Sequence, residues 1–277
     1  SELAKSTLAA LTASELKTLN VTGDKNLTIT GALSYNGTPA NGTAIDATID
    51  ASAFTGDLSL VLDGEAATLD VKGGSGSDSF NFDGTLTKND VVDGGAGVDT
   101  VKIDTHDGEA ATLKITDRKL TSVEVLEVEG TSNKNTSLNA DGDTVTTYDL
   151  IENAITAHTA TITNLAAGDS VSLTQSVAGT NNKKMGAVTL SLKDPSGTAD
   201  SIDLSILGTS GHGADEEIAS ITVADVETIN IKSTNDGTTA MLTTDENELA
   251  SGVFNAATDI NITGDANFTL TALTAAK

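Results

Sequence analysis

Cysteine is absent from this chain of 277 residues, which excludes both a disulfide framework and a cysteine-ligated zinc site. Tryptophan is also absent and aromatic residues make up only 3%, so we expect a thin core of Val, Ile, Leu and Ala. Two prolines beside 26 glycines are typical of a chain rich in turns rather than stiff linkers. No run of about 18 apolar residues occurs, so we expect no membrane insertion.

Basic residues are scarce. Fifteen Lys and Arg residues face 40 Asp and Glu residues, which gives a formal net charge of −25. Nucleic acids and anionic membranes need a basic surface, so neither is expected as a partner. The charge instead fits a protein that binds divalent cations, because each ion offsets carboxylate repulsion that would oppose a compact state.

Catalytic motifs are missing as well. The three histidines, His106, His158 and His212, are scattered, and neither an H-E-x-x-H zinc motif nor a G-x-S-x-G nucleophile motif is present. The Ser-Gly-His sequence at 210–212 is better interpreted as part of a flexible polar loop. We therefore expect no enzymatic activity.

Two copies of a nine-residue pattern, G-G-x-G-x-D-x-U-x with U a large apolar residue, occupy residues 73–81 and 94–102. This pattern is known as a calcium-binding β-helix repeat. Its glycines permit backbone conformations with positive φ, so main-chain carbonyls can join the Asp carboxylate in the oxygen-only shell that calcium prefers. The apolar residue starts a short strand directed into a core. An ordinary cluster of Gly-Asp turns is the alternative, and it rarely repeats five positions in register.

The two loops begin 21 residues apart, at Gly73 and Gly94. One coil of a β-roll takes about 18 residues, so the loops are predicted to stack on the same side of the coil with room for an ion between them. Asp90 and Asp93 are additional ligand candidates, since Asp90 lies four residues before the second Gly-Gly pair. The main predicted calcium ligands are two side chains and four main-chain carbonyls: Asp78, Asp99, Gly74, Gly76, Gly95 and Gly97.

Short segments of alternating apolar and polar residues, rich in Val, Ile and Thr, dominate the chain and predict an all-β fold. Three segments, 6–16, 150–157 and 244–250, have residues suited to short helices. The predicted strands are 17–21, 27–30, 58–62, 67–71, 100–103, 111–115, 123–128, 144–148, 160–163, 170–174, 187–192, 201–206, 227–231, 259–263 and 268–271.

Sequence repeats favour one all-β architecture. Residues 19–30 are echoed at 260–271, and residues 121–128 at 224–231. Such reuse is expected when coils stack and bury each other's apolar faces, so we predict a parallel β-solenoid or β-roll. A β-sandwich is the alternative for residues 140–240.

Two segments are expected within this fold. Residues 1–135 form the solenoid segment with the calcium loops, and residues 136–277 form a second β-rich segment of related repeats. Glu124 and Glu227 occupy matching positions in the second repeat pair, and we expect them to be structural or to bind an ion.

The chain resembles RTX-type surface-layer (S-layer) proteins in several sequence features. These are the nonapeptides, the sequence Asn-Asp-Val-Val-Asp-Gly-Gly at 89–95, the Val-Glu-x-Leu/Ile-x-Val/Ile strands and the phrases at 162–169 and 199–204. Only the nonapeptides are specific, since the strand phrases also occur in type I-secreted adhesins. The resemblance implies type I secretion from a Gram-negative cell, folding in external calcium and assembly of copies into a two-dimensional lattice on the cell surface. It also implies a further calcium ion at Asp200, which lies in a similar turn.

Two classes of function follow. The favoured one is a structural component of a calcium-dependent, self-assembling bacterial surface layer. The alternative is an RTX adhesin module that binds a host surface or glycan. The chain starts at Ser1 without a signal peptide and stops abruptly at Lys277, so we expect a fragment of a longer protein. Regions outside the fragment would provide export and anchoring, the latter to a cell-surface polysaccharide.

Overall fold

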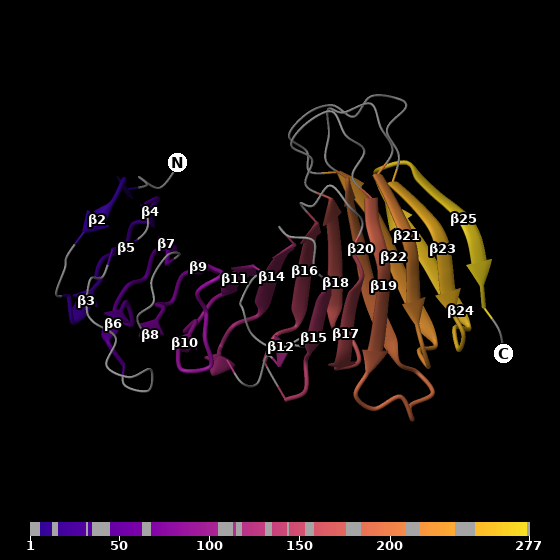
Figure 1. Cartoon of the computed structure of the whole chain (residues 1–277), viewed down its shortest axis with the longest axis horizontal. Coiled ribbons are helices and arrows are strands. Elements are labelled where there is room, and N and C mark those ends of the chain that lie inside the picture. The colour runs from indigo at the N-terminus through magenta and orange to yellow at the C-terminus, as the bar shows by residue number, and fades with distance from the viewer. Residues whose placement is uncertain are drawn as a thin grey trace. The chain divides into compact units, whose positions relative to one another are not determined.

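The computed structural model describes residues 6–12, 16–31, 33–34, 45–62, 68–104, 113–114, 118–130, 135–142, 144–152, 158–175, 184–208, 216–235 and 247–275. These residues form β-strands joined by turns and short connections, with no α-helix among them (Figure 1). None of the described segments is therefore a helix long and apolar enough to cross a bilayer.

The chain divides into two compact units. Unit 1 comprises residues 1–108, 114–127 and 142–145, and unit 2 comprises residues 109–113, 128–141 and 146–277. Two strands have residues in both units, namely β12 (Leu113–Lys114) and β14 (Val125–Gly130).

Unit 1 is a stack of short parallel strands. Its strands follow one another in the sheet orders β1-β4-β7-β9-β11, β13-β10-β8-β6-β3 and β2-β5, and every one of these pairs is parallel. The strands are β1 (Ser6–Leu8), β2 (Leu11–Thr12), β3 (Thr18–Asn20), β4 (Leu27–Ile29), β5 (Leu33–Ser34), β6 (Ala47–Asp50), β7 (Leu58–Val61), β8 (Leu69–Lys72), β9 (Ser79–Asp83), β10 (Val91–Asp93), β11 (Thr100–Asp104) and β13 (Leu120–Thr121).

Unit 2 has two parallel sheets between which the chain alternates. Their orders are β16-β18-β20-β22-β24 and β15-β17-β19-β21-β23-β25. The strands are β15 (Thr136–Asn139), β16 (Thr147–Glu152), β17 (Ala160–Leu165), β18 (Ser170–Gln175), β19 (Lys184–Leu192), β20 (Ser201–Gly208), β21 (Glu216–Val223), β22 (Thr228–Asn235), β23 (Asn247–Phe254), β24 (Asp259–Gly264) and β25 (Phe268–Thr274).

The core of each coil follows from the alternation of the strands, since successive side chains point to opposite faces. In β9, Phe80 and Phe82 are buried while their neighbours are only partly covered. Parallel register stacks the buried positions, so Leu60, Phe80 and Val101 form one column through three coils. A column of this kind leaves each coil dependent on its neighbours for burial.

The predicted parallel β-solenoid is confirmed. Each predicted strand coincides with or overlaps an observed one. Of the predicted strand 111–115, only residues 113–114 lie in the described ranges, and they form β12. The sandwich alternative for 140–240 is wrong, because the strands of that region pair in parallel along two continuous sheets. An antiparallel sandwich would require hairpin-type pairing.

The predicted helices are wrong where the structure describes them. Residues 6–8, 11–12, 150–152 and 247–250 lie in the strands β1, β2, β16 and β23. Helix preferences of Leu, Ala and Glu amount to tenths of a kcal/mol per residue. A segment held beside a preceding parallel coil gains ladder hydrogen bonds and a buried face, and these outweigh that preference.

Candidate metal site

The two nonapeptide loops stack as their spacing predicted. Thr100 pairs with Ser79 and Val101 with Phe80 in adjacent coils. Between the loops themselves, the main-chain N–H of Ala96 donates to the carbonyl of Gly74 at 2.9 Å. The second loop therefore lies directly over the first.

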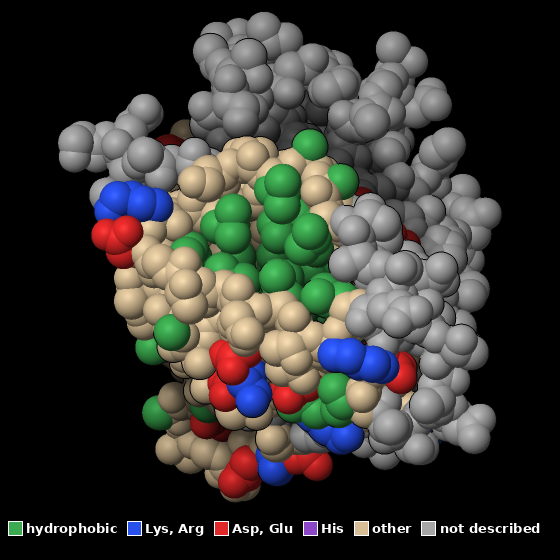
Figure 2. All heavy atoms as spheres, turned by 90° about the vertical axis from the view of Figure 1, so that its left-hand side faces the viewer, with side chains coloured by type: hydrophobic (Ala, Val, Ile, Leu, Met, Phe, Trp, Pro, Cys, Tyr) green, Lys and Arg blue, Asp and Glu red, His purple; other side chains and the backbone are tan. Residues whose placement is uncertain are grey.

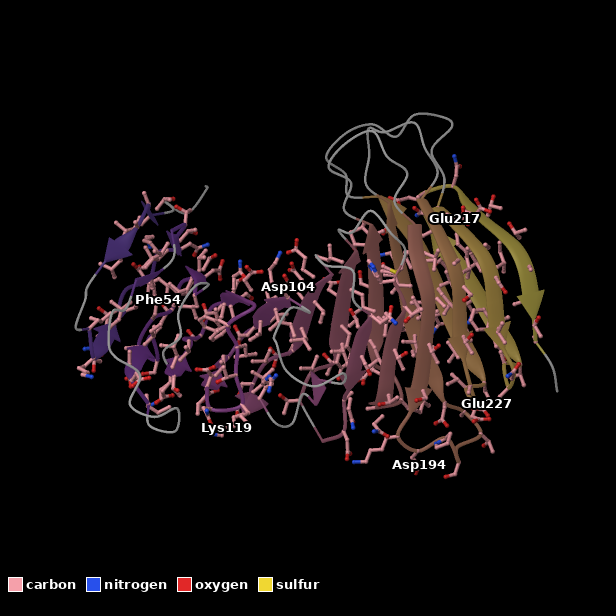
Figure 3. All side chains as sticks on the ribbon, in the orientation of Figure 1. Phe54, Asp104, Lys119, Asp194, Glu217 and Glu227 are labelled. Carbon is pink, nitrogen blue, oxygen red and sulfur yellow. The ribbon has the colours of Figure 1, made fainter. Side chains whose placement is uncertain are left out.

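The glycines of the loops are positions of close backbone approach. A side chain at Gly95 would collide with the carbonyl of Gly74, and one at Gly97 with the carbonyl of Gly76. Gly74 in turn lies against the carbonyl of Phe54 in the preceding coil, a residue labelled in Figure 3. Gly95 and Gly97 also have positive φ values of 98° and 132°. The glycines thus meet a stacking requirement in addition to any ligand role of their carbonyls.

The loop aspartates form a ladder of hydrogen bonds between coils. Asp78 Oδ1 accepts from the N–H of Leu58 at 2.8 Å, and Asp99 Oδ1 accepts from the N–H of Asp78 at 2.7 Å. Glu124 Oε2 continues the series by accepting from the N–H of Asp99 at 2.9 Å. Each carboxylate therefore caps a main-chain donor of the preceding coil, which keeps that buried donor satisfied.

One buried carboxylate oxygen in this ladder accepts no hydrogen bond from the described residues. Asp78 Oδ2 accepts from the N–H of Gly74 at 2.7 Å, whereas the buried Asp99 Oδ2 has no hydrogen-bond partner among the described residues. Burial raises the pKa of Asp99 to about 6, and the negative charges of Asp78, Glu124 and Asp93 add to the rise against the hydrogen bond from the Asp78 N–H. Burial likewise raises the pKa of Asp78. At neutral pH, Asp99 is a desolvated anion among other anions.

This arrangement suits a hard cation or a proton at Asp99 Oδ2. Either would satisfy the free oxygen and relieve the repulsion from the neighbouring carboxylates. All the nearby side-chain ligands are oxygens, which is the donor set of calcium rather than of a softer metal. The described residues contain no group of three His, Cys, Asp or Glu side chains that could hold a metal, so main-chain oxygens or water would have to complete the shell.

The two secondary candidates lie in different places. Asp90 is at the corner between β9 and β10, away from Asp78 and Asp99, which precede β9 and β11. Both of its oxygens are engaged, one by the N–H of Leu69 at 2.7 Å and the other by the Thr87 N–H and hydroxyl. Asp93 lies beside the second loop, where its Oδ1 accepts from the N–H of Gly95 at 3.3 Å. Of these two aspartates, only Asp93 adds to the rise in the pKa of Asp99.

Asp200 reproduces the arrangement of Asp99 inside unit 2. Its N–H donates to Glu227 Oε2 at 3.0 Å, and its carbonyl accepts from the N–H of Thr228 at 3.0 Å. Its Oδ2 is also a buried oxygen with no partner among the described residues. Glu227 projects from the turn that leads into β22 (Figure 3). Asp99–Glu124 and Asp200–Glu227 are equivalent pairs in the two units.

The repeat between 121–128 and 224–231 explains this equivalence. Ser122 and Asp225, at matching positions, have φ values of 50° and 56°, which is rare for residues with a side chain. The next residues, Val123 and Val226, are buried. The left-handed turn and the buried Val together fix the direction of the Glu that follows.

Asn26 and Asp57 form a second ladder, in which each side chain accepts from the following coil instead of the preceding one, and this ladder was not predicted. Asn26 Oδ1 accepts from the N–H of Asp57 at 3.1 Å, and Asp57 Oδ1 accepts from the N–H of Ser77 at 3.0 Å. The sequence position of these residues could have identified them. They lie directly before the predicted strands 27–30 and 58–62, just as Asp78 and Asp99 lie directly before β9 and β11.

Comparisons with known proteins give no further guide to this site. No family model, no curated protein sequence and no solved structure matches the chain.

Proposed function

We propose that this chain is a structural component of a calcium-dependent, self-assembling surface layer on a Gram-negative bacterium, reached by type I secretion. The observation that carries the proposal is the stack of two Gly-Gly-x-Gly-x-Asp loops with a buried, unpartnered oxygen on Asp99. In this proposal calcium binds at Asp99 Oδ2 between the stacked loops. Asp78 and the loop carbonyls contribute through lone pairs that their hydrogen bonds leave available, since each oxygen has two. A second ion binds at Asp200 beside Glu227.

Calcium has a folding role in this proposal rather than a chemical one. A chain with net charge −25 resists compaction, and an ion that binds only the folded state stabilises that state by mass action. In a cytoplasm with little free calcium the folded state would lack this stabilisation. External calcium would then couple binding to folding.

The outermost strands of the described coils can pair with a further coil. β1 ends a sheet of unit 1, and β24 and β25 end the two sheets of unit 2. Leu8 of β1, Ile262 of β24 and Leu273 of β25 are 42%, 49% and 49% exposed. Figure 2 shows hydrophobic side chains gathered on the face of unit 1 that it views. Such outermost strands are templates for pairing with a further coil of the same chain or with another copy, and a lattice protein can use the second kind of pairing as a contact.

Electron microscopy of the protein in calcium and in EDTA tests the proposal. We expect ordered sheets in millimolar calcium and dispersed chains in EDTA. Chains that remain monomeric in calcium and bind glycans instead would favour the adhesin alternative.

A pair of substitutions tests the calcium site separately. We expect Asp78→Asn with Asp99→Asn to abolish most of the calcium-induced rise in Tm, because each amide keeps one oxygen acceptor but loses the negative charge. At position 78 the amide also loses one of two main-chain donors, which lowers Tm with and without calcium alike and leaves the rise as the readout. Asp90→Asn is the matched control at the opposite corner and should retain the rise. Scanning calorimetry with and without calcium measures both, and an equal rise in wild type and the double variant would contradict the site.

A further inference from the structure

The outer face of the sheet β16-β18-β20-β22-β24 in unit 2 holds a groove of about 640 Å³ (strand labels in Figure 1). Two rows of polar side chains flank it, and each row takes one residue from every strand in matching register. The first row is Thr147, Ser170, Asp203, Asn230 and Asn261, and the second is Asp149, Ser172, Ser205, Lys232 and Thr263.

The floor of the groove is main chain. Val171, Leu204 and Ile231 lie between the two rows, and their side chains are buried in the interior of the unit. The two rows are two residues apart along each strand, which corresponds to about 7 Å. A ligand in this groove would therefore meet polar groups on both sides. Its apolar contacts would be the carbon atoms of those side chains and of the main chain beneath, because the Val171, Leu204 and Ile231 side chains point inward.

Part of the first row is held in place by its own hydrogen bonds. Asn261 Nδ2 donates to Asn230 Oδ1 at 2.9 Å, and Asn230 Nδ2 donates to Asp203 Oδ1 at 2.7 Å. Each amide group has two donor hydrogens and two acceptor positions, so both asparagines keep capacity for a ligand. Side chains that are ordered beforehand lose less entropy on binding.

We propose that this groove binds an extended, neutral oligosaccharide. The polar rows repeat at the strand spacing of about 4.8 Å, which is close to the length of one sugar unit in an extended chain. Hydroxyl, amide and carboxylate groups are matched to the donor and acceptor hydroxyls of sugars. An acidic polysaccharide is disfavoured, because Asp149 and Asp203 outnumber Lys232 in the groove and the chain as a whole carries −25.

An extended peptide fits the same groove less well. Peptides that add to a sheet require a free edge, and β18, β20 and β22 each pair on both sides. Peptide recognition also relies on pockets for side chains, and the floor here offers main chain only. The inference does not depend on calcium or on self-assembly.

Isothermal titration calorimetry with cellohexaose, maltohexaose and mannohexaose tests this inference on the whole chain. At least one of these neutral hexasaccharides should bind with a Kd below about 1 mM. A hexamer of galacturonate and an extended Ser/Asn-rich peptide are the competing probes. Failure of all three neutral sugars to bind, or tighter binding of either competing probe, would overturn the proposal.

Variants locate the binding. Asn230→Ala with Asn261→Ala removes the amide row, and Ser172→Phe fills the groove from the other row; each should raise Kd about tenfold or more. Thr189→Ala changes an exposed residue of β19 in the opposite sheet and should leave Kd unchanged. Circular dichroism verifies that each variant is folded. A Kd that is unaffected by both groove variants, or that Thr189→Ala shifts equally, would place the binding elsewhere and contradict the proposal.

Discussion

Glycine has two separable roles in the nonapeptide loops, one as backbone that approaches another coil and one as a source of carbonyl ligands. Gly76 allows the distinction, because its Cα faces the carbonyl of Gly56 in the preceding coil. A methyl group there would collide with backbone, which cannot give way as a flexible side chain does. The packing role exists without calcium.

We therefore expect Gly76→Ala to lower the free energy of unfolding by about 2 kcal/mol or more even in EDTA. Ser75→Ala is the matched control, since the Ser75 side chain is exposed and its main-chain N–H bonds to Phe54 whatever the side chain. Urea unfolding in EDTA and in calcium measures both variants. A Gly76→Ala loss confined to calcium would mean that ligation, rather than stacking, requires this glycine.

At the scale of the element, the turns before β14 and β22 are one module used twice. Each contains a residue with positive φ, a buried Val and a Glu that accepts the N–H of an Asp in the preceding coil. Substitutions can distinguish the contribution of the Glu as a hydrogen-bond acceptor from the contribution of its negative charge.

Glu227→Ala should cost about 1–3 kcal/mol, because it leaves the N–H of Asp200 without its acceptor. Glu227→Gln keeps an oxygen in place and should cost less. The same contrast is expected for Glu124→Ala and Glu124→Gln next to Asp99. Urea unfolding in EDTA measures the four variants. If Gln proved as costly as Ala at both positions, charge rather than hydrogen bonding would be the contribution of these glutamates.

The strands were more predictable than the partners of their corner residues. The alternation of apolar and polar residues shows which side chains of a strand face the core. In a stack of parallel coils these buried side chains determine the fold, so the strands can be predicted. The ladder from Asp78 through Asp99 to Glu124 spans separations of 21 and then 25 residues, and that from Asp200 to Glu227 spans 27. Because coil length varies, no fixed period in the sequence identifies which donor each carboxylate meets.

The missed strands have a related cause. Residues 47–50 and 136–139 are four-residue strands with only two buried positions at most, so their pattern is too short to identify alone. Residues 247–254 contain residues suited to a helix, yet they form β23 between β21 and β25. Hydrogen bonding to the neighbouring coils makes these segments strands, although their local sequence pattern does not predict it.

At the scale of the whole molecule, buried acids make stability depend on pH in an unusual direction. The pKa of Asp99 is about 6 in the folded chain against an ordinary 3.8, and burial also raises the pKa values of Asp78 and Asp169. The folded chain then binds more protons than the unfolded chain between about pH 4 and pH 6. Hydrogen bonds from Ser52 and Ser196 lower the pKa values of Asp50 and Asp194, and that contribution is lost only below about pH 4.

In EDTA, we therefore expect the free energy of unfolding to rise by about 1 kcal/mol as pH falls from 7 to 5, because protonation removes the desolvated charge of Asp99. Asp99→Asn should flatten this rise, since an amide does not titrate. In millimolar calcium the slope should reverse, because protons compete with calcium for the same carboxylate. Urea unfolding at several pH values under both conditions separates the two effects. If the free energy of unfolding rose in EDTA but its slope did not reverse in calcium, Asp99 would be a buried acid that binds no cation. A flat profile in EDTA would show that Asp99 already has a partner.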